Sequence, residues 1–437
     1  AELPKDGSHF DLPIALSILC ISGTLNQGDI NDAVFAGELA LDGSLRPIRS
    51  AIITAEVAKN QKIKSVYVPA QNAKQAALVT GIDVFPVENL KSLFLHLKKE
   101  KIIKPIDRLS IKNTSLNHKS VPTIDDIYGQ EQAKRAIQIA VAGRHNILLS
   151  GPPGSGKTML AKSLKNLLPA LSEDEIVEVT KLHSLGEHTI INNPIVDRPF
   201  RSPHHTASRA SIIGGGSKVQ PGEISLAHRG VLFLDELLEY PRTVLESLRQ
   251  PLEDHEITVS RANGKFNFPA NFLLVATMNP CPCGFLGDPE KTCICSQNQI
   301  LNYQKRLSGP LLDRIDLTVS VSRVPHEKLL NNKVSTKSQQ ETFLSEIHKA
   351  YSIQRDRYKC SYKYNNDIQS SNVDKITSIS ESAKTFLTNA AKKLDLSTRS
   401  YFKVIKVSRT IADLEGSASI EIPHIAESLQ YRQINIG

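Results

Sequence analysis

This chain of 437 residues has no run of about 18 apolar residues, the length that a transmembrane helix needs. We therefore expect no transmembrane helix and no association with a membrane. Asp6, Asp11 and Pro13 interrupt the early apolar stretch, so we expect no secretory signal peptide and a cytoplasmic protein. Disulfides are rare in that compartment, and the six cysteines are therefore not expected to form a disulfide framework.

The chain has fewer acidic than basic residues, so it is not a strongly acidic protein. Lysine and arginine total 53 against 45 aspartates and glutamates, which gives a net charge of +8 and an isoelectric point near 9.0. Such an excess suits a polyanionic partner such as a nucleic acid. Solvated surface lysines would give the same sum, so the charge alone leaves both interpretations open.

A glycine-rich loop is the most informative motif in the chain. Residues 151–158 read GPPGSGKT and fit G-x-x-x-x-G-K-[ST] at every fixed position. Residues 145–150 predict a buried strand before the loop, and residues 157–168 predict an amphipathic helix after it. In this context, backbone N–H groups and a helix N-terminus can surround a triphosphate. The residues expected to bind ATP are Gly151, Pro152, Pro153, Gly154, Ser155, Gly156, Lys157 and Thr158. Lys157 would reach the β- and γ-phosphates, and Thr158 would ligate Mg²⁺.

Two further apolar segments end in polar residues suited to hydrolysis. Residues 230–236 (GVLFLDE) predict a strand followed by Asp235, which suits Mg²⁺ coordination, and by Glu236, which is placed to activate water as a general base. Residues 271–279 (NFLLVATMN) predict a second strand, after which Asn279 would orient water near the γ-phosphate. The alternatives are a solvated acidic pair and an ordinary Asn-Pro turn.

An arginine follows an apolar turn later in the chain. Residues 308–317 (SGPLLDRIDL) place Arg314 after a Pro-led apolar turn. Such an arginine can reach the γ-phosphate of a neighbouring subunit as an arginine finger. The alternative is a salt bridge to Asp313 or Asp316.

Taken together, the segments GPPGSGKT, LFLDE, ATMN and LLDRID resemble those of AAA+ ATPases. Residues 198–222 (RPFRSPHHTASRASIIGGGSKVQPG) are similar to the magnesium-chelatase-like branch, and within it to the ComM/YifB family. That family is implicated in natural transformation (competence) and in DNA branch migration. The resemblance covers essentially the whole chain. It implies ATP and Mg²⁺, a ring that is expected to be a hexamer, branched and single-stranded DNA as largely sequence-independent partners, and recombination proteins as further partners.

The resemblance also assigns roles at both ends of the ATPase region. Gly129 and Gln130 match the segment that packs beside adenine, although a simple helix N-terminus is the alternative. Residues 397–416 match the lid helix, in which Arg399 would contact nucleotide. Its apolar face is predicted to contain Val404, Ile405, Ile411 and Leu414. The residues expected to be more exposed are Arg399, Lys403, Lys406 and Arg409. A solvated basic face is the alternative, and it is favoured for Lys403 and Lys406.

Two inserts could contact DNA. Residues 204–222 contain Arg209, three consecutive glycines and Lys218, and the glycines would let a tight loop approach a nucleic-acid backbone closely. Lysine and arginine there would neutralise phosphates without reading sequence. The alternative is a solvent-exposed loop.

The second insert, residues 257–268 (ITVSRANGKFNF), places two strand-like runs around Asn263-Gly264, a strong hairpin signal. Arg261 and Lys265 flank the turn. By resemblance, this is the hairpin that AAA+ rings direct into their central pore. A solvent-exposed hairpin is again the alternative.

Four of the six cysteines lie within fifteen residues, in the pattern C-x-C-x₉-C-x-C. Four thiolates on a loop with glycine and proline turns can close tetrahedrally on Zn²⁺. The predicted ligands are Cys281, Cys283, Cys293 and Cys295. A four-ligand site would be structural, since it leaves no open position, and free thiols are the alternative.

The N-terminal region resembles the proteolytic domain of Lon. The resemblance rests on residues 3–8 (LPKDGS) and 37–48 (GELALDGSLRPI). His9 occupies the position of the nucleophilic serine, and residues 48–53 lack the expected lysine, so we expect no peptidase activity. The chain starts inside the motif, which predicts that residues upstream of Ala1 are missing.

We therefore predict an α/β protein with an AAA+ P-loop core. A Lon-protease-like domain spans residues 1–103, a linker 104–122, the large α/β subdomain 123–325 and a helical lid 326–437. The expected function is a ring-forming ATPase that translocates DNA, as a branch-migration helicase for recombination of incoming DNA. The alternatives are a protein-remodelling or metal-chelatase-type motor and a non-hydrolysing scaffold, against which Glu236 argues.

Overall fold

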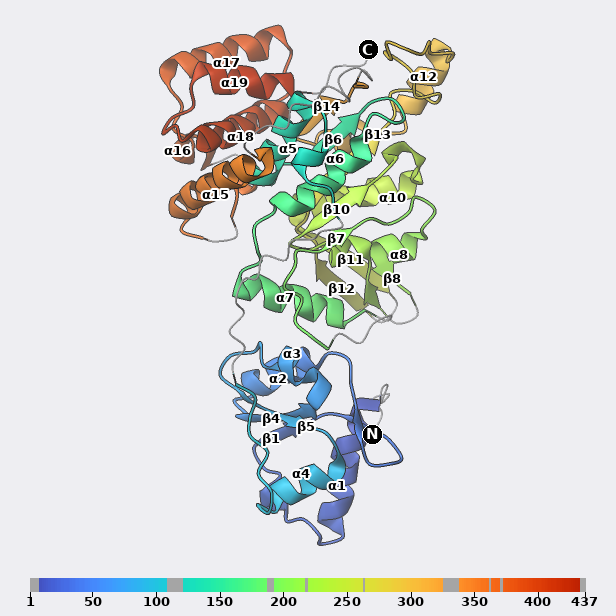
Figure 1. The fold of residues 1–437 in the computed structure, drawn as a ribbon, viewed down its shortest axis with the longest axis vertical. Coiled ribbons are helices and arrows are strands. Elements are labelled where there is room, and N and C mark those ends of the chain that lie inside the picture. Colours follow the sequence, from blue (N-terminus) through green and yellow to red (C-terminus); the bar gives the residue numbers. More distant parts are fainter. Residues whose placement is uncertain are drawn as a thin grey trace. The chain divides into compact units, whose positions relative to one another are not determined.

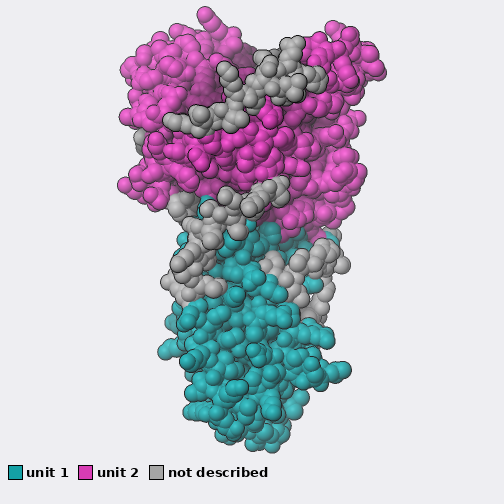
Figure 2. All heavy atoms as spheres, in the orientation of Figure 1, with its two compact units in different colours: residues 1–114, 170–197, 216–221 teal, residues 115–169, 198–215, 222–437 magenta. Residues whose placement is uncertain are grey.

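The structure is a computed structural model that describes residues 8–107, 121–186, 192–216, 219–261, 264–324, 338–360, 363–369 and 372–432. The chain forms two compact units. Unit 1 comprises residues 1–114, 170–197 and 216–221, and unit 2 comprises the remainder (Figure 2). Most of the predicted linker and the LPKDG run near the N-terminus lie outside the described residues.

Unit 1 is built on a parallel three-stranded sheet in the order β1-β4-β5. Its strands are β1 (Ala33–Phe35), β4 (Ser65–Pro69) and β5 (Asp83–Val87), and a two-stranded hairpin joins β2 (Glu38–Leu39) to β3 (Leu45–Arg46). The helices of its N-terminal segment are α1 (Asp11–Ile21), α2 (Ala51–Asn60), α3 (Ala73–Ala76) and α4 (Leu90–Leu97). His9 lies in a short 3₁₀ turn ahead of α1.

A helix from much later in the chain completes unit 1. This helix, α7 (Glu173–Ser184), contacts α2, and Ile176 and Val179 join the apolar cluster that contains Ile52 and Val66. The side chain of Ser172 caps the helix by accepting a hydrogen bond from the backbone N–H of Glu175. Residues from the sequence between two strands of unit 2 are therefore part of the core of unit 1.

Unit 2 contains a parallel five-stranded sheet in the order β14-β6-β13-β10-β7 (Figure 1). The strands are β6 (Ile147–Ser150), β7 (Phe200–Arg201), β10 (Val231–Leu234), β13 (Leu273–Met278) and β14 (Leu317–Ser320). The three central strands are almost entirely buried, because helices cover a parallel sheet on its faces. The parallel arrangement brings the carboxyl ends of β6, β13 and β10 together at one edge, where α/β proteins bind ligands.

The sheet is accompanied by helices and by one hairpin. The helices before the C-terminal region are α5 (Glu131–Gly143), α6 (Lys157–Ser163), α8 (Arg209–Ile213), α9 (Glu223–Leu226), α10 (Arg242–Ser247), α11 (Arg249–Asp254), α12 (Gln297–Gln304) and α13 (Gly309–Leu312). β11 (Glu256–Arg261) pairs with β12 (Gly264–Pro269) in antiparallel register, which confirms the predicted hairpin. A mixed α/β fold with a parallel P-loop sheet was predicted and is confirmed.

The described part of the C-terminal region is helical. It contains α15 (Gln339–Tyr358), α16 (Val373–Ile376), α17 (Glu381–Lys393), α18 (Thr398–Glu415) and α19 (Ile422–Gln430). α18 packs against α5, α15 and α19. Among the described helices, none combines the length and the apolar character needed to cross a membrane.

The surroundings of α18 correct one sequence expectation. Arg409 was expected to be exposed, yet 1% of its surface is accessible and its guanidinium pairs with Asp413 at 2.9 Å. Arg357 from α15 pairs with the same carboxylate. Lys403 and Lys406 are also partly buried, and each donates a hydrogen bond to a backbone carbonyl. The expectation was wrong for Arg409, because helices surround this part of α18, whereas Arg399 at the start of the helix is exposed as predicted.

Candidate nucleotide-binding site

The glycine loop joins β6 to α6 at the carboxyl edge of the sheet. Gly154 and Gly156 adopt φ angles of 77° and 89°, in the left-handed region that favours glycine. Gly151 is constrained by contact, because a Cβ there would lie 2.1 Å from the carbonyl oxygen of Val321. The loop conformation therefore depends on glycine at these three positions.

Lys157 is the first residue of α6, and 9% of its surface is exposed. Its ammonium donates to the carbonyl oxygens of Gly151 (2.7 Å) and Pro152 (2.8 Å) and to Oδ1 of Asn279 (3.3 Å). Burial lowers the pKa of Lys157, and the charges of Asp235 and Glu236 oppose that shift. A buried cation whose hydrogen bonds go to neutral acceptors is well suited to a phosphate.

The predicted magnesium ligands lie next to each other. The hydroxyl of Thr158 donates to Oδ2 of Asp235 at 3.1 Å, and Asp235 follows β10 directly. The neighbouring Glu236 is exposed, with a φ angle of 52°. A hydroxyl and a carboxylate at this distance could both ligate Mg²⁺, and an exposed carboxylate beside them could accept a proton from water.

Sequence analysis missed Thr277, which holds the acidic pair in place. Its hydroxyl donates to Oδ1 of Asp235 and accepts a hydrogen bond from the backbone N–H of Glu236 at 3.0 Å. Thr277 is 1% exposed on β13, two residues before Asn279. A hydroxyl in an otherwise apolar strand was the signal that could have identified it.

Gly129 and Gln130 lie beside the phosphate loop. Both residues adopt positive φ angles, 62° and 59°, just before α5. The side-chain amide of Gln130 donates to the carbonyl oxygen of Ser322 at 2.5 Å and lies 3.5 Å from that of Ser155. This segment thus connects the start of α5, the loop and the residues after β14.

The two predicted arginines share one acidic partner. Arg314 and Arg399 both pair with Glu253 on α11, Arg399 through Nη2 at 2.7 Å. Within the described ranges, Arg314 pairs with Glu253 rather than with Asp313 or Asp316. The hydrogen bond from Arg314, followed by the charges of both arginines, lowers the pKa of Glu253, and partial burial opposes this shift. Sequence reasoning did not identify Glu253, since nothing in its local pattern distinguishes it.

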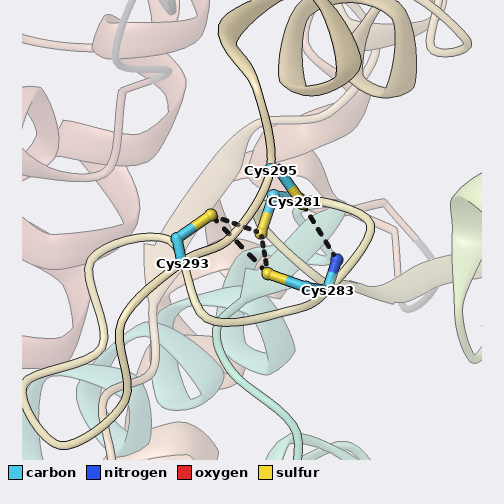
Figure 3. A group of neighbouring side chains, drawn as sticks. All are labelled: Cys281, Cys283, Cys293 and Cys295. Carbon is cyan, nitrogen blue, oxygen red and sulfur yellow. Dashed lines mark hydrogen bonds between the residues drawn. The ribbon is translucent and has the colours of Figure 1, made fainter.

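The four predicted zinc ligands lie together on the loop after β13 (Figure 3). The sulfur of Cys281 lies 3.4 Å from that of Cys283 and 3.6 Å from that of Cys293, and all four sulfurs lie within 4.8 Å of one another. Four sulfurs around one Zn²⁺ at about 2.3 Å would be about 3.8 Å apart. The backbone N–H of Phe285 lowers the pKa of Cys283 to about 6, which favours its thiolate, whereas burial raises the pKa of Cys281.

The predicted DNA-binding residues are only partly described. Arg209 is exposed at the start of α8, and Lys265 is exposed on β12. Lys218 and the side chain of Arg261 lie outside the described residues. Contact of these residues with DNA therefore stays a prediction.

The fold and the site define a class of protein. A parallel sheet with a glycine loop before an α-helix, a lysine and threonine at the start of that helix, and an acidic pair after a nearby strand is the arrangement of a P-loop ATPase. The helices that follow the sheet agree with an AAA+ lid.

Comparisons with known proteins narrow the class to a family. Residues 123–329 match the family described as magnesium chelatase, subunit ChlI, residues 337–432 match its C-terminal family, and residues 1–72 match the family described as subunit ChlI of Mg-chelatase. The chain is 42% identical over 435 residues to Competence protein ComM of Haemophilus influenzae, covering 99% of this chain and 84% of that protein. It is 38% identical over 439 residues to the uncharacterized protein YifB of Escherichia coli, covering 100% of this chain and 84% of that protein.

The chain belongs to the ComM/YifB family of magnesium-chelatase-like AAA+ ATPases. This confirms the resemblance inferred from the sequence. Membership implies ATP and Mg²⁺ as ligands and indicates ATPase activity.

Proposed function

We propose that the protein is a ring-forming ATPase that couples hydrolysis to movement along DNA, as a branch-migration motor for recombination of incoming DNA during natural transformation. The observation that carries the proposal is the convergence of Lys157, Thr158, Asp235, Glu236 and Asn279 at one sheet edge, in a chain similar along its length to a competence protein. The net charge of +8 and the exposed Lys265 support DNA as the partner.

Each residue has a role in this proposal. Residues 151–158 would hold the phosphates, and Thr158 and Asp235 would hold Mg²⁺, which supplies charge neutralisation at the β- and γ-phosphates. Glu236 would accept the proton of the attacking water, and Asn279 would orient that water. Gly129 and Gln130 would lie beside adenine.

Two arginines have roles in the proposed ring. Arg314 and Arg399 contact Glu253, and no hydrogen bond or ion pair found in the described part of the chain joins them to the phosphate loop. By resemblance to AAA+ ATPases, we place Arg314 at the γ-phosphate of the next subunit, and Arg399, which pairs with the same carboxylate, in contact with nucleotide. A hexamer is the assembly that we propose.

Zn²⁺ in the four-cysteine cluster is a further part of the proposal. The sulfur separations agree with one tetrahedral ion. Its role would be structural.

Lys157→Ala is expected to weaken ATP binding by roughly 10-fold to 100-fold, because it removes a charged donor worth about 1.5–3 kcal/mol at the phosphates. Equilibrium titration with a fluorescent ATP analogue measures the effect. Lys162→Ala, on the same helix, is the matched control and should bind as the unaltered protein does. Unchanged affinity in Lys157→Ala would contradict the assignment of the loop.

DNA is expected to stimulate ATP hydrolysis, and the stimulation should fall as salt rises because counterions compete for phosphate contacts. ATPase rates are measured with no DNA, single-stranded DNA, forked DNA and a three-stranded junction, at fixed salt. Lys265→Ala should lower the slope of log DNA affinity against log salt by about 1 and leave the basal rate unchanged. Lys74→Ala, an exposed lysine of unit 1, is the control. Absence of binding, stimulation and strand displacement would refute the DNA-motor proposal.

The second candidate is a protein-remodelling or metal-chelatase-type motor. The observation that favours it is the match of three segments to magnesium chelatase families. An ATPase rate that is insensitive to every DNA substrate at low salt would favour this candidate.

A further inference from the structure

The cysteine loop packs directly against the phosphate loop. Gly284, which lies between the second and third cysteines, has a φ angle of 83°. A Cβ at this position would lie 2.6 Å from Cδ of Pro153 and 3.9 Å from Cγ of Asn279. The proline ring is rigid, so only glycine allows the two loops to approach this closely.

Arg323 also connects the two loops. Arg323, three residues after β14, donates from Nη2 to the carbonyl oxygen of Pro153 at 3.2 Å. Its Nε lies 3.1 Å from the fully buried side chain of Asp288, and its Nη1 lies 3.3 Å from Glu290. The guanidinium also lies 5.6 Å from the ring centre of Phe285.

The acidic residues that hold Arg323 belong to the segment between the cysteine pairs. Asp288 is fixed in turn, because its Oδ1 accepts the backbone N–H groups of Glu290 at 2.8 Å and Lys291 at 3.1 Å. Cys283 and Cys293 bound this segment on either side. Joining the four sulfurs through one ion would restrict the segment to a small set of conformations.

We propose that Zn²⁺ bound by the four cysteines fixes this loop against the phosphate loop, and that Arg323 is the positioning residue that transmits the constraint to Pro153. The inference rests on the proposed binding of ATP by residues 151–158. A phosphate loop binds its ligand through N–H groups, and its carbonyls must be directed elsewhere. Arg323 donates to the carbonyl oxygen of Pro153, and Gly284 lies directly against the proline ring. Metal occupancy therefore raises the affinity for ATP without touching the nucleotide.

The experiment uses the full chain. Zinc content is measured by mass spectrometry of the metal. Zinc is then released with a mercurial reagent and a chelator, and the protein is returned to Mg²⁺ buffer. The affinity for the ATP analogue is measured before and after this treatment. Release of zinc is expected to weaken binding about tenfold, and reloading is expected to restore it. Arg323→Gln is expected to weaken binding to a similar extent while the zinc content stays at one ion per chain.

Arg46→Gln is the control, since Arg46 is an ion-paired arginine in unit 1. Arg323→Gln tests the coupling in a chain that keeps all four cysteines, and its circular dichroism and melting temperature establish that it is folded. A chain that takes up no zinc on reconstitution overturns the metal site. A zinc-loaded Arg323→Gln variant that binds the analogue as tightly as the unaltered protein overturns the coupling.

Failure of the proposed function has a different signature. If the unaltered chain binds no ATP, both proposals fall. If zinc controls ATP affinity but DNA neither binds nor stimulates hydrolysis, the DNA motor falls and the coupling stands.

Discussion

Arg314→Ala is expected to lower the rate of ATP hydrolysis by about 1000-fold or more, while each subunit still binds ATP. An arginine finger stabilises charge on the phosphoryl group in the transition state and contributes little to ground-state binding. In the part of the chain that the structure describes, Arg314 pairs with Glu253 on α11, so its loss should leave the phosphate loop of its own subunit intact. Hydrolysis rates and analogue binding, measured on the same preparation, separate the two effects.

Mixing subunits tests whether Arg314 acts across an interface. Arg314→Ala lacks the finger, whereas Lys157→Ala retains the finger but has a damaged ATP site. An equimolar mixture should recover measurable hydrolysis, because some interfaces then combine an intact loop with an intact finger. Arg249→Ala, on the same helix as Glu253, is the control and should behave as the unaltered protein does. A mixture no more active than its components would place Arg314 outside the shared site.

Glu236→Gln is expected to lower the rate of hydrolysis by roughly 100-fold to 10,000-fold, the range for loss of a general base. Glutamine keeps the shape of the side chain but cannot accept the proton of water. The backbone N–H of Glu236 bonds to Thr277 at 3.0 Å, and this contact does not depend on the side chain. The variant should therefore keep its fold and accumulate bound ATP.

Single-turnover hydrolysis and retention of ATP on the purified complex measure the effect of Glu236→Gln. Glu239→Gln is the control, since Glu239 is a nearby carboxylate that pairs with Arg306 at 3.8 Å. Normal turnover in Glu236→Gln would refute the general-base role and favour a nucleotide-gated scaffold.

The parts of the site that were predictable depend on short stretches of chain. The strand, loop and helix around residues 151–158 follow from periodicity and glycine placement, and the hairpin at Asn263-Gly264 follows from its turn chemistry. The acidic pair and Asn279 follow from apolar runs that end in polar residues. Parallel strands then bring these ends to one edge without further information.

The parts that were not predictable depend on contacts between distant segments. Glu253 binds Arg314 and Arg399, which lie 61 and 146 residues away. Arg323 joins two loops that share no local pattern with it. Arg409 was misassigned because periodicity indicates which face of α18 is most apolar, but not that other helices also cover its opposite side.

The placement of α7 has a consequence for how the chain can be divided. The sequence leaves the ATPase unit after residue 169, contributes apolar side chains to the other core, and returns at residue 198. If the chain were cut within residues 108–120, the C-terminal fragment would still contain Ile176 and Val179. These side chains would then lack the α2 residues against which they pack. Each unit is therefore assembled from segments that are discontinuous in the sequence. We therefore expect that neither unit folds fully from one uninterrupted stretch of the sequence.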